Sequence, residues 1–115
     1  VTADGNPEKE EAAYKAAMLL EVINMTIPGV PCIYQGDEYG EAGANDPDNR
    51  HMMKFDNLTE RQAQFRAEMQ SLLPLLYGEY VPVEVTDNKL VFDRVYMGET
   101  VRVSIDLANL AYTIE

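Results

Sequence analysis

The spacing of apolar residues changes near residue 78, and this change limits the folds open to the chain. Before it, two segments carry apolar residues every three or four positions, which is typical of helices with one buried face. After it, apolar residues alternate with polar ones, which is typical of strands packed on one side: Val81, Val83, Val85, Leu90, Phe92, Tyr96, Val101, Val103, Ile105 and Leu107. The sequence therefore predicts an α+β chain that ends in a small antiparallel β-sheet.

The first helix is expected over residues 7–26. Asn6 is a good N-cap, and Pro7 suits the first helical position, where no amide proton is needed. The helix is apolar on two sides, so we expect it to be covered on both. One side carries Ala13, Ala16, Ala17, Leu20, Ile23 and Ile27, and the other carries Met18, Leu19, Val22 and Met25.

A capping box marks the start of the second helix, expected over residues 58–73. Thr59 and Gln62 stand at the spacing that lets each side chain bond the backbone of the other residue. The chain is then expected to leave the helical part at Leu76-Tyr77-Gly78. Turns are predicted at Asp87-Asn88 and Met97-Gly98, with a fourth strand over residues 109–114.

Between the helices, the sequence changes abruptly from apolar to polar. Pro28 and Gly29 stop the first helix, and residues 30–34 form an apolar run that predicts a buried strand of a parallel sheet. Cys32, the lone cysteine, is expected to be a small buried thiol within it. The strand would lead directly into a polar loop with several glycines, which is the layout of an active-site rim.

The chain is strongly acidic, with 20 Asp and Glu residues against 9 Lys and Arg residues in 115, a formal charge of −11. This charge argues against nucleic acid and anionic membrane surfaces as partners. The sequence holds no run of 18 apolar residues, so no membrane-spanning helix is predicted. No motif indicates a cofactor.

Two motifs carry a resemblance to a known family. The run PGVPCIYQGDEYG is followed by GANDPDNRHMMKF. In this order they resemble the alpha-amylase family of glycoside hydrolases, family 13, and within it the neopullulanase, cyclomaltodextrinase and maltogenic-amylase group. The resemblance implies that residues 1–76 end a catalytic (β/α)8 TIM barrel, with residues 30–35 as its last strand and 36–57 as the following loop. Residues 77–115 would form the C-terminal β domain.

The resemblance also implies a reaction, the hydrolysis of α-glucosidic bonds in starch-like glucans or malto-oligosaccharides. Retaining glycosidases need two carboxylates about 5 Å apart. In this family those groups come from barrel strands four, five and seven, and no acid of this chain stands in a matching motif. No catalytic residue is therefore assigned, and the chain is expected to be an inactive fragment of the enzyme. Asp37 and Glu38 are expected to support the loop, because adjacent side chains on an extended segment point in opposite directions.

Asp46 and Arg50 are the candidate substrate-binding residues. A carboxylate and a guanidinium four residues apart can hold each other while their other polar sites face sugar hydroxyls. In the neopullulanase-like group the matching Asp and Arg bind glucose units on the non-reducing side of the cleaved bond. The alternative is structural: Asp46-Pro47 opens a turn and Arg50 anchors the loop.

Other residues of this loop receive structural assignments. Asp46, Asp48 and Asn49 are rich in oxygen ligands, but Pro47 breaks the alternation of a calcium loop, so no metal site is predicted. His51 lacks a second ligand at metal spacing and is expected to be a hydrogen-bonded loop residue. Apolar packing beneath the loop is expected of Met52, Met53 and Phe55.

Two further expectations concern the chain as a whole. The rival to the enzyme-fragment reading is a non-catalytic domain that binds a glycan or a protein and retains an amylase-like segment. If the chain is a piece of a barrel, the strand at residues 30–34 would lack neighbours on both edges. The isolated chain is then expected to self-associate, or residues 28–57 to leave the family geometry.

Overall fold

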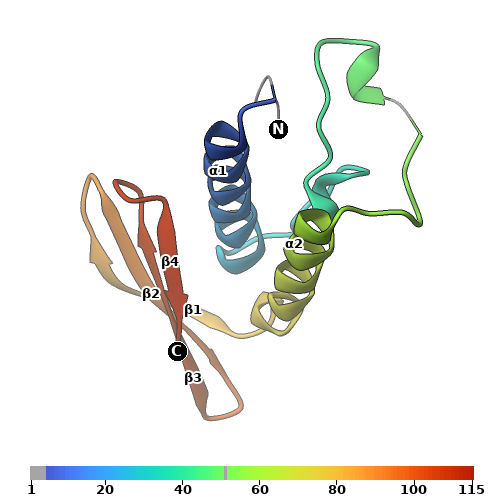
Figure 1. The fold of residues 1–115 in the computed structure, drawn as a ribbon. Coiled ribbons are helices and arrows are strands. Elements are labelled where there is room, and N and C mark those ends of the chain that lie inside the picture. The colour runs from blue at the N-terminus through green and yellow to red at the C-terminus, as the bar shows by residue number, and fades with distance from the viewer. Residues whose placement is uncertain (1–4, 51) are drawn as a thin grey trace.

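The computed structural model describes residues 5–50 and 52–115, which fold as an α+β chain (Figure 1). The predicted α+β class and the small antiparallel sheet are confirmed. Two helices are joined by a long loop and followed by four strands: α1 Pro7–Thr26, α2 Glu60–Ser71, β1 Glu79–Val85, β2 Lys89–Tyr96, β3 Glu99–Asp106 and β4 Ala111–Ile114. Three short 3-10 helices are η1 Asp37–Tyr39, η2 Asp48–Arg50 and η3 Leu73–Leu76. No helix in the described ranges is long and apolar enough to cross a membrane.

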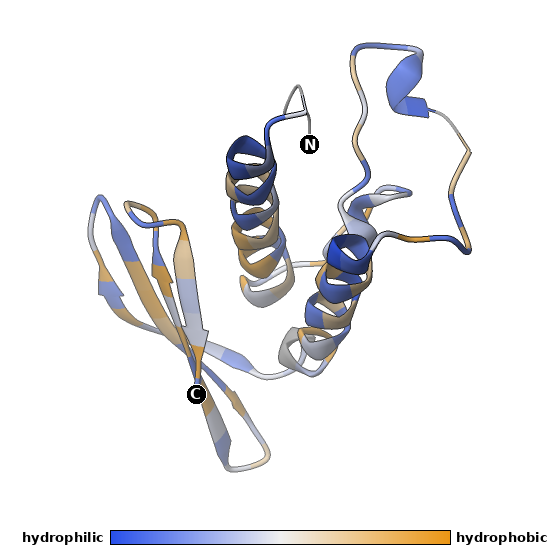
Figure 2. Ribbon diagram, in the orientation of Figure 1, coloured by the Kyte–Doolittle hydropathy of each residue, from blue (hydrophilic) through white to orange (hydrophobic). Residues whose placement is uncertain are grey.

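Helix α1 begins where its cap was predicted. The Asn6 side chain accepts hydrogen bonds from the backbone amides of Glu8, at 3.0 Å, and Lys9, at 3.3 Å. Tyr14, Met18, Leu19, Val22 and Met25 are buried, and Ala17 and Ile23 pack against the core, whereas Leu20 and Ile27 are exposed. Hydropathy colouring shows the polar residues of α1 gathered near its N-terminus and the apolar ones toward its C-terminus (Figure 2). Cover on both sides is therefore partial: the helix packs against both α2 and the sheet, but Leu20 and Ile27 remain exposed.

The predicted capping box of α2 is also present. Thr59 Oγ1 accepts from the Gln62 amide at 3.1 Å, and Gln62 Oε1 accepts from the Thr59 amide at 3.0 Å. Each side chain satisfies a backbone donor that the helix itself cannot pair. The helix ends at Ser71, before the Pro74 that lies within η3.

The four strands form an antiparallel sheet in the order β1-β2-β3-β4. Phe92 is opposite Val103 and Leu90 is opposite Ile105, so the apolar residues of neighbouring strands lie on the same face. The turn at Met97-Gly98 has positive φ at both residues, 49° and 82°, which suits the tight β2–β3 hairpin. The expected turns and fourth strand are confirmed, and β3 shows the expected alternation, with Val103 and Ile105 buried. In β1 the prediction is wrong, because Val81, Val83 and Val85 are exposed.

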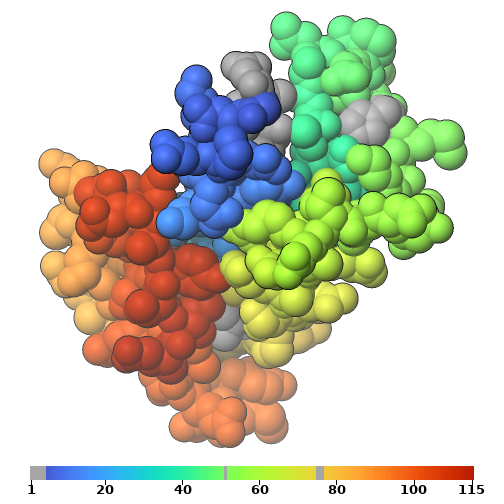
Figure 3. Space-filling view, in the orientation of Figure 1, coloured from blue at the N-terminus to red at the C-terminus, as the bar shows by residue number. Residues whose placement is uncertain are grey.

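One face of the sheet packs against the helices in a single core, with α1 between the sheet and α2 (Figures 1 and 3). Phe92 and Val103 are fully buried there among residues of both helices. The buried Arg94 of β2 donates from Nη1 to the carbonyl of Thr26 at 3.0 Å, at the C-terminus of α1. A cation suits that end of a helix, because the last carbonyls have no helical partner. The core therefore includes residues that come before and after residues 76–78. The domain boundary predicted there remains a prediction.

The predicted strand at residues 30–34 does not form. This segment is extended but unpaired, and Val30 is 97% exposed. A strand needs a neighbouring strand for its amides and carbonyls, and the described residues provide none beside this segment. Cys32 is exposed as well, so the prediction of a buried thiol is wrong. Asn24 of α1 donates to the Cys32 carbonyl at 3.4 Å and holds the segment beside the helix.

Candidate functional site

The loop between α1 and α2 lines an open cavity with a volume of about 450 Å³. Its lining comes from two stretches of the loop, which turn back toward each other. Residues from the first stretch include Tyr34, Tyr39 and Glu41, and those from the tip and return include Asp46, Arg50 and Met53. The tip projects beyond α2, away from the sheet (Figure 1).

The acidic turn at residues 36–40 begins this loop. Gly36 and Gly40 flank η1 with φ of 95° and 70°, a conformation that residues with a side chain rarely adopt. The Asp37 carboxylate accepts from the Tyr34 amide at 2.9 Å, and that of Glu38 accepts from the Gly36 amide at 2.9 Å. Both acids thus close the turn, as their supporting role predicts. They lie on a 3-10 helix, however, and not on the extended segment that was expected.

The candidate pair Asp46 and Arg50 forms an ion pair with two contacts. Arg50 Nε lies 2.6 Å from Asp46 Oδ1, and Arg50 Nη2 donates to Asp46 Oδ2 at 3.0 Å. Both side chains line the cavity and remain accessible, at 64% and 63% exposure respectively. Two parallel contacts of this kind are typical of a guanidinium bound to a carboxylate, because both groups are planar. The pairing is confirmed, and sugar binding remains a prediction.

Local hydrogen bonds fold the tip of the loop around this pair. The Asp48 carboxylate accepts from the Ala44 amide at 2.8 Å, and the Asp48 amide donates to the Asn45 carbonyl at 2.9 Å. The Arg50 amide donates to the Pro47 carbonyl at 3.0 Å. The tip is therefore a hydrogen-bonded unit in its own right, and its geometry is compatible with both the binding and the structural reading of Asp46 and Arg50.

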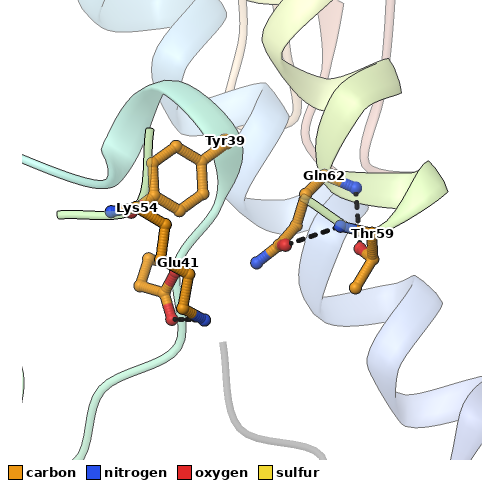
Figure 4. A network of polar contacts seen from close by, with 5 residues as sticks. All are labelled: Tyr39, Glu41, Lys54, Thr59 and Gln62. Carbon is orange, nitrogen blue, oxygen red and sulfur yellow. Dashed lines mark hydrogen bonds and ion pairs between the residues drawn. The ribbon is translucent and has the colours of Figure 1, made fainter. Parts of the chain in front are cut away.

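A second set of contacts joins the outgoing and returning stretches of the loop near its base (Figure 4). The hydroxyl of the buried Tyr39 accepts from the Lys54 backbone amide at 3.0 Å. Lys54 Nζ lies 3.0 Å from Glu41 Oε1, and this hydrogen bond and charge raise the pKa of Lys54. The sequence alone did not indicate this clamp of Tyr39, Glu41 and Lys54. The only sign of the clamp in the sequence is that Glu41 and Lys54, on the two sides of the loop, carry opposite charges.

Glu21 of α1 lies near the acidic turn. Burial raises the pKa of its carboxyl group, and the charge of Asp37 raises it further, while a hydrogen bond with Asn24 opposes the shift. Such a combination can indicate a functional acid. Glu21 is not among the described residues that line the cavity, so we assign it no role in chemistry there.

The remaining predictions for this loop concern apolar packing, His51 and metal binding. Met52 and Phe55 are 88% and 80% exposed, so the predicted packing beneath the loop is wrong for them; Met53 is half-buried. This part of the loop stands away from the helix and sheet core (Figure 1), and Met52 and Phe55 do not belong to the core cluster of the described residues. His51 lies outside the described residues. Among the residues that the structure describes, no three His, Cys, Asp or Glu side chains are grouped to hold a metal ion.

The fold and the loop motifs define a class: the chain is similar to the C-terminal part of glycoside hydrolases of the alpha-amylase family. Among curated proteins, it is 35% identical over 104 residues to a cyclomaltodextrinase from Geobacillus thermopakistaniensis. The match covers 84% of this chain and 18% of that protein. The predicted resemblance is therefore confirmed, although no protein-family model matches the sequence.

Solved structures agree. The maltogenic amylase from S. marinus superposes with a TM-score of 0.64 and 25% identity, over 81% of this chain and 14% of that one. The cyclic alpha-maltosyl-(1→6)-maltose hydrolase from Arthrobacter globiformis, in complex with its cyclic sugar, gives a TM-score of 0.62 at 19% identity, over 86% and 24%. At that identity the second match shows the fold alone. The chain spans less than a quarter of the length of each of these three relatives.

Proposed function

We propose that the chain works as part of an alpha-amylase family enzyme that hydrolyses α-glucosidic bonds in starch-like glucans or malto-oligosaccharides. In this proposal residues 1–76 complete a catalytic (β/α)8 barrel, and residues 77–115 form the β domain after it. The observation that carries it is the Asp46–Arg50 ion pair, exposed on the lining of the loop cavity. Loops that follow barrel strands are where such enzymes bind substrate.

The catalytic carboxylates are proposed to lie outside these 115 residues. Within the cavity the described acids are already used: Asp37 closes the backbone turn, while Glu41 and Asp46 pair with cations. A retaining mechanism requires instead two carboxyl groups that act on the scissile bond from either side. The chain alone is therefore expected not to turn over maltohexaose or pullulan.

The role of Arg50 can be tested by sugar binding. Arg50→Ala is expected to weaken the binding of maltotriose by at least about tenfold, because hydrogen bonds from a charged donor contribute about 1.5–3 kcal/mol. Isothermal titration of the 115-residue chain measures this directly. Wild-type affinity is expected to be low, with a Kd of about 1 mM, since only part of a substrate cleft is present.

Arg102→Ala is the matched control. Arg102 holds Asp93 by two contacts, at 2.8 and 3.1 Å, on the sheet and away from the cavity. Its loss removes the same kind of ion pair and is expected to leave maltotriose binding unchanged. Hydrolysis of maltohexaose by the wild-type chain would contradict the assignment of catalysis to residues elsewhere. If the Arg50→Ala variant binds maltotriose as tightly as the wild-type chain, the result would favour the alternative in which Arg50 only anchors the loop.

The second candidate function is a non-catalytic domain that binds a glycan or a protein. It is favoured by the sheet and helices sharing one core, which lets the chain hold a fold of its own. The gene sequence upstream of this segment distinguishes the two candidate functions. A barrel with the family's three acids supports the enzyme, and an independent start directly before this segment supports the binding domain.

We also propose that the isolated chain self-associates. Leu20, Val30, Ile33 and Tyr34 are exposed apolar residues of α1 and the unpaired segment after it. Exposed apolar surface of this kind tends to be covered by another chain. Light scattering across a concentration series is expected to show more than one copy per particle. A single copy at every concentration would contradict the proposal.

A further inference from the structure

The clamp of Tyr39, Glu41 and Lys54 connects the loop tip to the core of the protein. Tyr39 is 1% exposed, and the next residue, Gly40, lies directly against Tyr14 and Phe65 of the helices. The Tyr39 hydroxyl then holds the Lys54 amide, which is 15 residues further along the chain. A continuous set of contacts thus runs from the helices to the returning stretch of the loop.

The ion pair of the clamp has one member, Glu41, on the lining of the same cavity. The Glu41 side chain is only 14% exposed, whereas that of Lys54 is 49% exposed. A pair with one partly buried member is less screened than a fully exposed one. The two residues are 13 positions apart, so the contact closes the segment that carries both Asp46 and Arg50.

We propose that Glu41 and Lys54 are positioning residues for the Asp46–Arg50 pair, a role that rests on the proposed sugar-binding function of that pair. The tip is a local hydrogen-bonded unit, and its internal contacts alone do not determine where it stands relative to Tyr34 and Tyr39 across the cavity. The clamp determines this by holding both ends of the tip to the core. A preorganised tip binds sugar without first losing conformational freedom.

Lys54→Met tests the proposal. It removes the ammonium group but keeps the backbone amide that bonds Tyr39. Maltotriose binding is expected to weaken by about two- to tenfold, the range for ordering a long side chain on binding. In ¹⁵N relaxation, the order parameters of the amides at residues 44–46 and 48–50 are expected to fall from about 0.85 toward 0.6. Lys54→Arg keeps a cation beside Glu41 and is expected to restore both values.

Lys89→Met is the matched control. Lys89 pairs with Glu84 at 3.4 Å on the sheet, with an exposure of 52% that is close to that of Lys54. This change is expected to leave both readouts unchanged. Unchanged order parameters in Lys54→Met would overturn the proposal, and so would reduced order parameters with unchanged affinity. If the wild-type chain binds no maltotriose, the proposed function fails, and the order parameters alone decide whether the clamp positions the tip.

Discussion

Replacing Phe92 by alanine is expected to lower the free energy of unfolding by about 3–5 kcal/mol, the range for truncating a buried aromatic side chain. The Phe92 ring is 0% exposed and belongs to the core that the sheet shares with both helices. It also packs against the Tyr80 ring, with centroids 5.0 Å apart. Its loss leaves a cavity at the contact between sheet and helices, which chemical denaturation followed by circular dichroism would measure.

Phe55→Ala makes the same chemical change at an exposed position. Phe55 is 80% exposed in the loop, so its truncation is expected to change the free energy of unfolding by less than about 0.5 kcal/mol. A small effect of Phe92→Ala, or equal effects of the two variants, would show that the sheet and helices do not share a core in solution.

Gly40→Ala is expected to lower the free energy of unfolding by about 2–4 kcal/mol, from two causes. The first is backbone strain, because Gly40 has φ of 70°, where a side chain costs about 1–2 kcal/mol. The second is overpacking, because an added Cβ would lie 2.8 Å from Tyr14 Cε1 and 3.5 Å from Phe65 Cδ2. Thermal and denaturant unfolding both report this change.

Gly98→Ala separates the two causes. Gly98 has a similar φ of 82°, but an added Cβ there meets no atom within 4 Å. Its replacement is expected to cost only the strain, about 1–2 kcal/mol. The difference between the two variants measures the close approach of the acidic turn to the helices. Equal losses would mean that Tyr14 and Phe65 move aside without cost.

Much of the secondary structure could be predicted because its causes are local. Asn6 caps α1 through amides two and three residues away, and Thr59 and Gln62 cap α2 reciprocally. The alternation of β2 and β3 was readable for the same reason, since side chains on a strand change face at every residue. The Asp46–Arg50 contact joins residues four apart, which is why the sequence could indicate it.

The incorrect predictions concern features that depend on distant partners. The apolar run at residues 30–34 has the composition of a buried strand, but a strand exists only where another strand pairs with it. Complete cover of α1 likewise requires surfaces that the described residues do not supply, so Leu20 remains exposed. Composition indicates which residues favour burial, and it does not determine what is present to bury them.

The sequence by itself therefore determined the positions and caps of the helices, the existence of the strands and their turns, the tip ion pair and the family resemblance. Only the tertiary structure decided how these parts meet. The bond from Arg94 to the Thr26 carbonyl joins residues 68 apart, and the clamp joins Lys54 to Glu41 and Tyr39 across the loop. Such contacts depend on the whole chain being folded, because nothing in the local sequence brings their partners together.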